Sequence, residues 1–193
     1  MADERLREGA EALTIRALAA IDLAAYKRLR DTTLAAEPEA FTSDAAEESV
    51  KPAQAYLSRF GLDRPDPHDG GQFTLGAFFG AAHLVGAVTC EREPRIKGRH
   101  IAHVAGMMVL AEVRGQGIGR QMLAECIALA RRAPGLEMLT LSVTASNRIA
   151  VELYLRAGFT RYGKLVHAIK IGGPAGDPTG ARYHDKDLMV LSL

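Results

Sequence analysis

Apolar and polar positions along the chain follow two different periods, and these periods predict strands and helices. Strand-like patterns occupy residues 13–18, 72–79, 84–92, 100–110, 138–143, 159–170 and 182–193. Apolar residues spaced three or four apart predict helices over residues 22–37, 49–60, 118–132 and 147–157. The predicted order is β-α-α-β-β-β-α-β-α-β-β, an α/β fold with a mixed, mostly antiparallel sheet and helices on both faces.

The connections between these elements add to the picture. The helix 118–132 joins the strands 100–110 and 138–143, and this crossover is long enough for the two strands to pair in parallel. Residues 63–71 and 172–180 are rich in glycine and proline, so we expect loops that form the rim of a binding site. No internal repeat is present, and we expect a single domain over residues 1–193, with residues 1–12 as an N-terminal extension.

Composition excludes several classes of protein. With 24 Lys and Arg against 23 Asp and Glu, the net charge of +1 offers no global field for nucleic acid or an anionic membrane, and we expect neither partner. The charged N-terminus lacks the apolar core of a signal peptide, which favours a cytoplasmic location. Cys90 and Cys126 are too few for a disulfide framework or a metal site, so we expect two buried thiols and no metal.

The stretch from Val109 to Arg120 carries the most chemistry. Gly115, Gly117 and Gly119 follow a predicted strand and open a predicted helix. Glycines leave backbone N–H groups unshielded, and the helix directs its positive dipole end to the same place. Together these features predict a site for a phosphate or pyrophosphate. The spacing matches neither the Walker A loop nor the G-x-G-x-x-G dinucleotide fingerprint.

Two blocks resemble the GNAT superfamily of N-acetyltransferases. The first has the form Q/R-x-x-G-x-G/A, and here it is Arg114-x-x-Gly117-x-Gly119. The second has the form N-x-x-A-x-x-L-Y-x-x-x-G-F, and here it comprises Asn147, Ala150, Leu153, Tyr154, Gly158 and Phe159. The separation of the blocks, one helix and one strand, is also that of the family. The resemblance covers the chain from about Leu13 onward and implies a GNAT-like fold with acetyl-CoA as the acyl donor.

The resemblance also implies roles for individual residues. Backbone groups at Met107, Met108 and Val109 would pair with the pantetheine arm of acetyl-CoA, and Asn147 would hydrogen-bond the cofactor. The pyrophosphate would lie on the turn formed by Arg114, Gly115, Gln116, Gly117, Ile118, Gly119 and Arg120. Tyr154 resembles the residue that protonates the departing thiolate, and a phenol with a pKa of about 10 holds its proton at neutral pH. Packing of Tyr154 and helix capping by Asn147 are the structural alternatives.

The general base is less evident from the family pattern. Histone-modifying relatives carry a glutamate on the strand that corresponds to residues 100–110, and His103 occupies its place here. Histidine accepts a proton at neutral pH, so His103 is the candidate base, with Glu91 and His100 as alternatives. A glutamate that N-terminal acetyltransferase relatives carry is replaced by Ser142, which cannot act alone as a base. The basic run that includes Arg92 and Arg99 is open to two interpretations, an anion contact and a solvated turn.

These observations predict an acetyl-CoA-dependent N-acetyltransferase. Acetyl would pass directly to a primary amine of a small molecule, peptide or protein, without an acyl-enzyme. The alternative is a non-catalytic acyl-CoA-binding regulatory or interaction module on the same fold. A homodimer is compatible with the resemblance, although no feature of the sequence establishes one.

Overall fold

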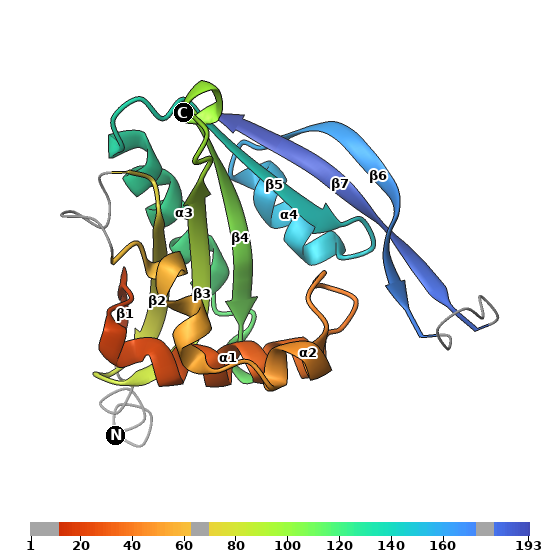
Figure 1. The fold of residues 1–193 in the computed structure, drawn as a ribbon, viewed down its shortest axis with the longest axis horizontal. Helices are drawn as coiled ribbons and strands as arrows, with labels where there is room; N and C mark the ends of the chain where they lie inside the picture. Colours follow the sequence, from red (N-terminus) through yellow and green to blue (C-terminus); the bar gives the residue numbers. More distant parts are fainter. Residues whose placement is uncertain (1–11, 63–69, 173–179) are drawn as a thin grey trace, which may run out of the picture.

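A seven-stranded sheet organises the molecule in the computed structural model, which describes residues 12–62, 70–172 and 180–193 (Figure 1). Its strands are β1 Leu13–Ala17, β2 Phe73–Phe79, β3 His83–Arg92, β4 Ile101–Val109, β5 Met138–Thr144, β6 Thr160–Ile171 and β7 Arg182–Ser192. They lie in the order β1-β2-β3-β4-β5-β7-β6, and every neighbouring pair is antiparallel except the parallel pair β4–β5. This arrangement confirms the predicted mixed, mostly antiparallel sheet and its parallel crossover.

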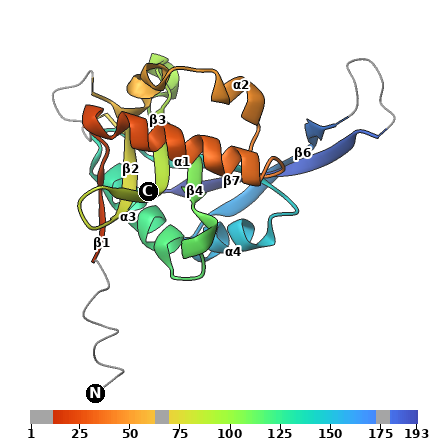
Figure 2. The ribbon, with the colours of Figure 1, turned by 90° about the horizontal axis from the view of Figure 1, so that it is seen from below.

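Helices cover both faces of the sheet, as predicted (Figure 2). The helices α1 Leu23–Ala36 and α2 Ala45–Ser49 lie on one side, with α3 Ile118–Arg132 and α4 Arg148–Arg156 on the other. Short 3-10 segments complete the connections: η1 Ala20–Asp22, η2 Ala53–Phe60, η3 Ile96–Gly98 and η4 Ala111–Val113. No helix of the described chain combines the length and the apolar character needed to cross a membrane.

The predicted single helix over residues 49–60 is wrong. The structure has α2, which ends at Ser49, and then η2, which begins at Ala53. Pro52 separates them because it lacks the N–H that a continuous helix needs and disfavours helical backbone in the residue before it. Gly61 ends η2 in the left-handed conformation at φ 69°, as its place in the sequence predicts. Much of each predicted loop, residues 63–69 and 173–179, lies outside the described residues.

Two apolar layers hold the helices on the sheet. Under α3, side chains such as Phe73, Met122 and Leu139 are fully buried. Cys90 and Cys126 belong to this layer and are free, which confirms the prediction of two buried thiols. Beneath α1, a separate layer includes the edge-to-face aromatic ring contacts of Tyr26 with Tyr56 and Phe60, at 5.7 and 5.3 Å between centroids.

The strands β4 and β5 pair at one end only and then diverge (Figure 1). Register pairs join residues 101–103 to residues 138–140, and the last of them is His103 with Thr140. Beyond that point β4 has an irregularity around Gly106, which has a φ of 57°, while β5 continues to pair with β7. A bulge of this kind bends a strand away from its neighbour. Residues 104–109 of β4 therefore have no strand partner on the β5 side.

Candidate active site

The glycine-rich turn after β4 forms an open cradle of backbone groups. Gly115 and Gly117 have φ values of 79° and 77°, a conformation that favours glycine, and a Cβ built on Gly115 would meet nothing within 4 Å. Gly117 precedes α3 and no side chain caps this end of the helix. The first bond of the helix is from Gln121 N to Gly117 O, so the N–H groups of residues 118–120 are available to a ligand. These features suit the pyrophosphate of the expected cofactor.

The two arginines of the turn behave differently. Arg114 donates to the backbone oxygen of Val109 at 3.0 Å and forms an ion pair with Glu37, at the end of α1. Its side chain is therefore directed along the strand and toward α1. Arg120 is exposed, and its guanidinium lies 3.9 Å from a Cβ built on Gly117. Of the two, Arg120 is the arginine without a partner in the described part of the chain, and it is better placed to meet a phosphate.

The end of β4 presents backbone to the gap and side chains to the two apolar layers. Met108 is buried under α1, whereas Met107 and Val109 pack on the α3 side, near Gly119. Because no strand pairs with this part of β4 on the β5 side, its peptide groups can hydrogen-bond a bound molecule. The role of residues 107–109 as partners of the pantetheine arm remains a prediction.

The helix α4 brings Asn147 and Tyr154 to the same gap. Asn147 is the N-cap, and its side-chain oxygen accepts from Ala150 N at 3.1 Å, which leaves the amide NH2 free to donate. Tyr154 is buried and packs edge-to-face on Phe159 at 5.9 Å. Its hydroxyl has no hydrogen-bond partner among the described residues, and burial raises its pKa. Each residue thus has a packing or capping role and also a free polar group.

His103 lies on β4 at the point where the strands separate. Its Nδ1 is 3.2 Å from the hydroxyl of Thr140, and its register partner on β3 is Glu91. Burial lowers the pKa of His103; the charge of Glu91 opposes this effect and that of Lys186 adds to it. The imidazole is therefore neutral at pH 7 and can accept a proton. His100, the other histidine considered, lies outside the cavity described next.

A cavity of about 230 Å³ joins these groups at the gap between β4 and β5. His103, Met107, Asn147 and Tyr154 all line it, as does Ser142. Sequence reasoning missed three basic residues of its wall, Arg30, Arg59 and Lys186. No local motif marks them, because they come from α1, η2 and β7 and meet only in the fold.

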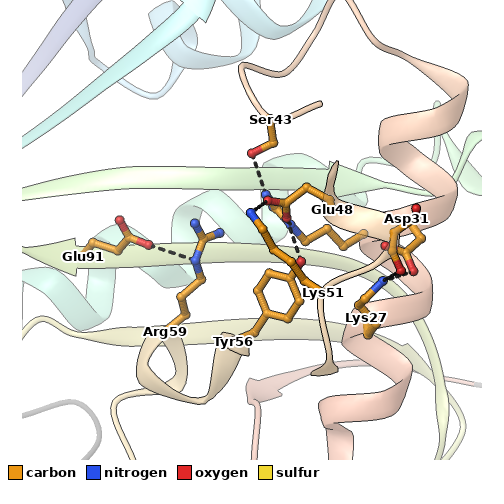
Figure 3. Close-up of polar contacts among 10 residues, drawn as sticks. Lys27, Asp31, Ser43, Glu48, Lys51, Tyr56, Arg59 and Glu91 are labelled. Carbon is orange, nitrogen blue, oxygen red and sulfur yellow. Dashed lines mark hydrogen bonds and ion pairs between the residues drawn. The ribbon is translucent and has the colours of Figure 1, made fainter. Parts of the chain in front are cut away.

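A polar cluster around the buried Glu48 includes two residues of the cavity wall, Arg30 and Ser43, and Figure 3 shows the contacts of this cluster. Glu48 of α2 accepts hydrogen bonds from Arg30 at 2.6 Å, Lys51 at 2.5 Å and Tyr56 at 2.7 Å. Arg30 also donates to the Ser43 hydroxyl at 2.8 Å, which ties the connection between α1 and α2 to the cluster. Burial alone would raise the pKa of Glu48, but the three hydrogen bonds outweigh it and lower the pKa to about 2.

The basic run before β4 contributes to structure at the other end of that strand. Arg92 donates to the backbone oxygens of Arg99 and Pro134, at 2.5 and 2.8 Å. This segment precedes β4, whereas the glycine-rich turn follows it, so the length of the strand separates the two. Among the described residues, no cluster of histidine, cysteine, aspartate and glutamate side chains is suited to a metal ion.

Known structures share this architecture. An acetyltransferase of the GNAT family from Streptococcus pneumoniae superposes with a TM-score of 0.78 at 23% identity, covering 94% of this chain and 100% of that one. The protein yncA from Salmonella typhimurium, solved with its cofactor acetyl-CoA, gives 0.70 at 20% identity, covering 94% of each chain. A spermidine N-acetyltransferase from Vibrio cholerae, in complex with CoA and spermine, gives 0.68 at 21%, covering 93% of this chain and 95% of that one. At these identities the likeness establishes the fold.

Sequence comparison establishes the family. No curated protein matches the chain. The model of the acetyltransferase (GNAT) family matches residues 30–159, which is more than half of the 193 residues. This span contains the glycine-rich turn, His103 and the block from Asn147 to Phe159. The chain therefore belongs to the acetyltransferase (GNAT) family.

Proposed function

We propose that this protein is an acetyl-CoA-dependent N-acetyltransferase that acts directly on a primary amine. The observation that carries the proposal is that His103 and Tyr154 line one cavity, at the gap between β4 and β5. A group able to accept a proton and a group able to donate one thus share a cavity. That pairing of roles is what amine acetylation requires.

The donor would be held by groups that the fold leaves free. The first-turn N–H groups of α3 and the side chain of Arg120 suit its phosphates, and the unpaired edge of β4 suits its amide-containing arm. The free amide NH2 of Asn147 adds a donor at the same gap. When bound, acetyl-CoA supplies an activated thioester, whose acetyl group goes to the amine and whose thiol is released.

His103 is the proposed base. The Thr140 hydroxyl lies 3.4 Å from the backbone oxygen of Ala102, to which it can donate, and we therefore assign the imidazole hydrogen to His103 Nδ1, as donor to that hydroxyl. This assignment leaves Nε2 with a free lone pair. Nε2 takes one proton from the substrate ammonium, and the neutral nitrogen then forms the new bond to the acetyl carbon as the C–S bond breaks. The nitrogen loses a second proton as the amide forms, which replaces the proton that the acid gives to the departing sulfur. One proton, held on His103, then passes to solvent. Glu91 on the neighbouring strand stabilises the imidazolium that results.

Tyr154 is the proposed acid. Because burial raises its pKa, the phenol keeps its proton until the departing sulfur requires one. A cysteine nucleophile is not needed, since Cys90 and Cys126 lie in the core and neither lines the cavity. Acetyl can therefore pass directly from acetyl-CoA to the amine, within a complex of both substrates.

A thiol-release assay tests this function. Purified protein is incubated with acetyl-CoA and a panel of primary amines, and binding of acetyl-CoA is measured separately by calorimetry. Amine-dependent release of CoA, with the acetylated amine found by mass spectrometry, is the expected result. Tight binding of acetyl-CoA without turnover on any amine would favour the non-catalytic acyl-CoA-binding module. The absence of both binding and turnover would exclude both the acetyltransferase and the non-catalytic module.

A further inference from the structure

We propose that the acceptor amine carries a negatively charged group, such as the carboxylate of an amino acid, and that Lys186 binds this group. This inference rests on the proposed N-acetyltransferase function and assigns its substrate class. It derives from the arrangement of charges around the cavity.

Lys186 has a donor to spare. Its ammonium donates to the Thr42 hydroxyl at 2.5 Å and the Ser142 hydroxyl at 3.5 Å. Both partners are neutral, and an ammonium has three hydrogens, so one hydrogen remains for a ligand. Lys186 lines the cavity and is partly buried, which lowers its pKa and makes a missing counter-ion more costly than at the surface.

The other charges of the cavity are already balanced. Arg30 faces Glu48 at 2.6 Å, Arg59 faces Glu91 at 3.5 Å, and Glu37 pairs with Arg114. In the described residues, by contrast, no carboxylate lies within 4.0 Å of the Lys186 ammonium. The cavity therefore has one positive charge, that of Lys186, which no carboxylate of the described residues neutralises.

The neighbours of Lys186 on β7 cannot supply that neutralisation. Asp185 and Asp187 flank it in sequence, but successive side chains of a strand point to opposite faces. The carboxylate of Asp187 instead forms an ion pair with the guanidinium of Arg161 at 2.7 Å, and the carboxylate of Asp185 lies 3.9 Å from the ammonium of Lys164. Glu39, on the connection after α1, is engaged with Arg182 at 3.2 Å.

The position of Lys186 relative to His103 sets the orientation of the acceptor. The register places Lys186, Ser142 and Thr140 on one face of the sheet, the face to which His103 also projects. A substrate anion on Lys186 would direct the amine of the same molecule toward His103. A polyamine would instead bring a second ammonium toward the ammonium of Lys186, which is electrostatically unfavourable.

Matched acceptors test the assignment. An amino acid and its primary amide differ at the carboxyl group, so KM is measured for both with saturating acetyl-CoA, and for spermidine. The Lys186→Met variant should raise KM for the amino acid by about 10- to 100-fold, the range for a hydrogen bond to a charged group. KM for the amide should change by less than about 3-fold, and Lys186→Arg should restore much of the loss. Lys170→Met, an exposed lysine of β6, is the matched control.

A binding measurement separates failure of this inference from failure of the proposed function. Calorimetry with the CoA-loaded protein compares an N-acetyl amino acid with its N-acetyl amide, so that no turnover is required. Selective binding of the acid, lost in Lys186→Met and kept in Lys170→Met, would support the anion site. Equal binding of acid and amide, a preference for spermidine, or an equal effect of Lys186→Met on acid and amide would overturn it. The last result would mean that Lys186 acts on His103 and not on the acceptor.

Discussion

Replacing Glu48 by glutamine should destabilise the protein by several kcal/mol. The Glu48 side chain is 7% exposed, and its three hydrogen-bond donors all point at carboxylate oxygens. Glutamine retains one such oxygen and presents an NH2 group where the other was. In Glu48→Gln, at least one donor faces another donor, and the guanidinium of Arg30, itself 3% exposed, loses its counter-ion.

Two independent estimates give a similar size for this effect. Removing one partner of a buried ion pair typically costs about 3–5 kcal/mol. The lowered pKa gives a second value: a change from 4.5 to about 2 corresponds to about 3 kcal/mol, since a tenfold change in proton affinity is worth about 1.4 kcal/mol. Because the folded-state pKa lies below the unfolded one, this stabilisation is complete above about pH 4.5 and is lost as pH falls toward 2.

Urea unfolding of both proteins, at pH values between 7 and 3, measures the free-energy difference. We expect the free energy of unfolding of Glu48→Gln to be about 3 kcal/mol lower than that of the wild type at pH 7. At pH 3 the difference should be roughly half of this or less, because a protonated glutamic acid resembles glutamine. Glu47→Gln, an exposed neighbour on α2, should change stability by less than about 0.5 kcal/mol. A difference for Glu48→Gln below about 1 kcal/mol at pH 7, or one that does not change with pH, would refute this reasoning.

Four further substitutions test the site and its scaffold. Tyr154→Phe should lower kcat by about 10²- to 10⁴-fold and leave the calorimetric Kd for acetyl-CoA unchanged, because it removes only the proposed acid. His103→Gln should abolish an ascending limb that the wild-type rate–pH profile shows below pH 6.5, the sign expected for a base whose pKa is lowered; a limb that persists places the base elsewhere. Gly117→Ala should weaken acetyl-CoA binding measured by calorimetry and cost about 1 kcal/mol in urea unfolding, since its φ of 77° strains any other residue. Gly76→Ala should cost about 1–3 kcal/mol in the same unfolding assay, because a Cβ there would lie 2.5 Å from a Leu18 methyl carbon.

Elements whose ends are marked by glycine or proline could be predicted from the sequence. The helix 118–132 was located to the residue because Gly117 precedes it and Pro134–Gly135 follows it. The boundary between α2 and η2 could not be predicted in the same way. The helical spacing of apolar residues continues past Pro52, whereas the helical backbone is interrupted there. The glycine-rich turn could also be identified from the sequence, because all of its residues are contiguous.

The acceptor side of the site could not be predicted in this way. Arg30 and Glu48 are 18 residues apart on two helices, and each alone is an ordinary polar position on a helix. Lys186 lies in the charged half of β7, between Asp185 and Asp187, so nothing in the sequence distinguishes it until Ser142 and Thr42 are found beside it. The direction of Arg114 likewise depends on Glu37, 77 residues earlier in the chain.

The three register pairs between β4 and β5 have a mechanical consequence. They join a block of β1 to β4 to a block of β5, β7 and β6, and the sheet is continuous between the blocks only through residues 101–103 and 138–140. A molecule that bridges the gap farther along would add a second connection between the blocks. Those amide protons of residues 104–109 that do not donate to β3 should then exchange with solvent quickly in the free protein and slowly with acetyl-CoA bound. Small rotations of one block against the other should be damped.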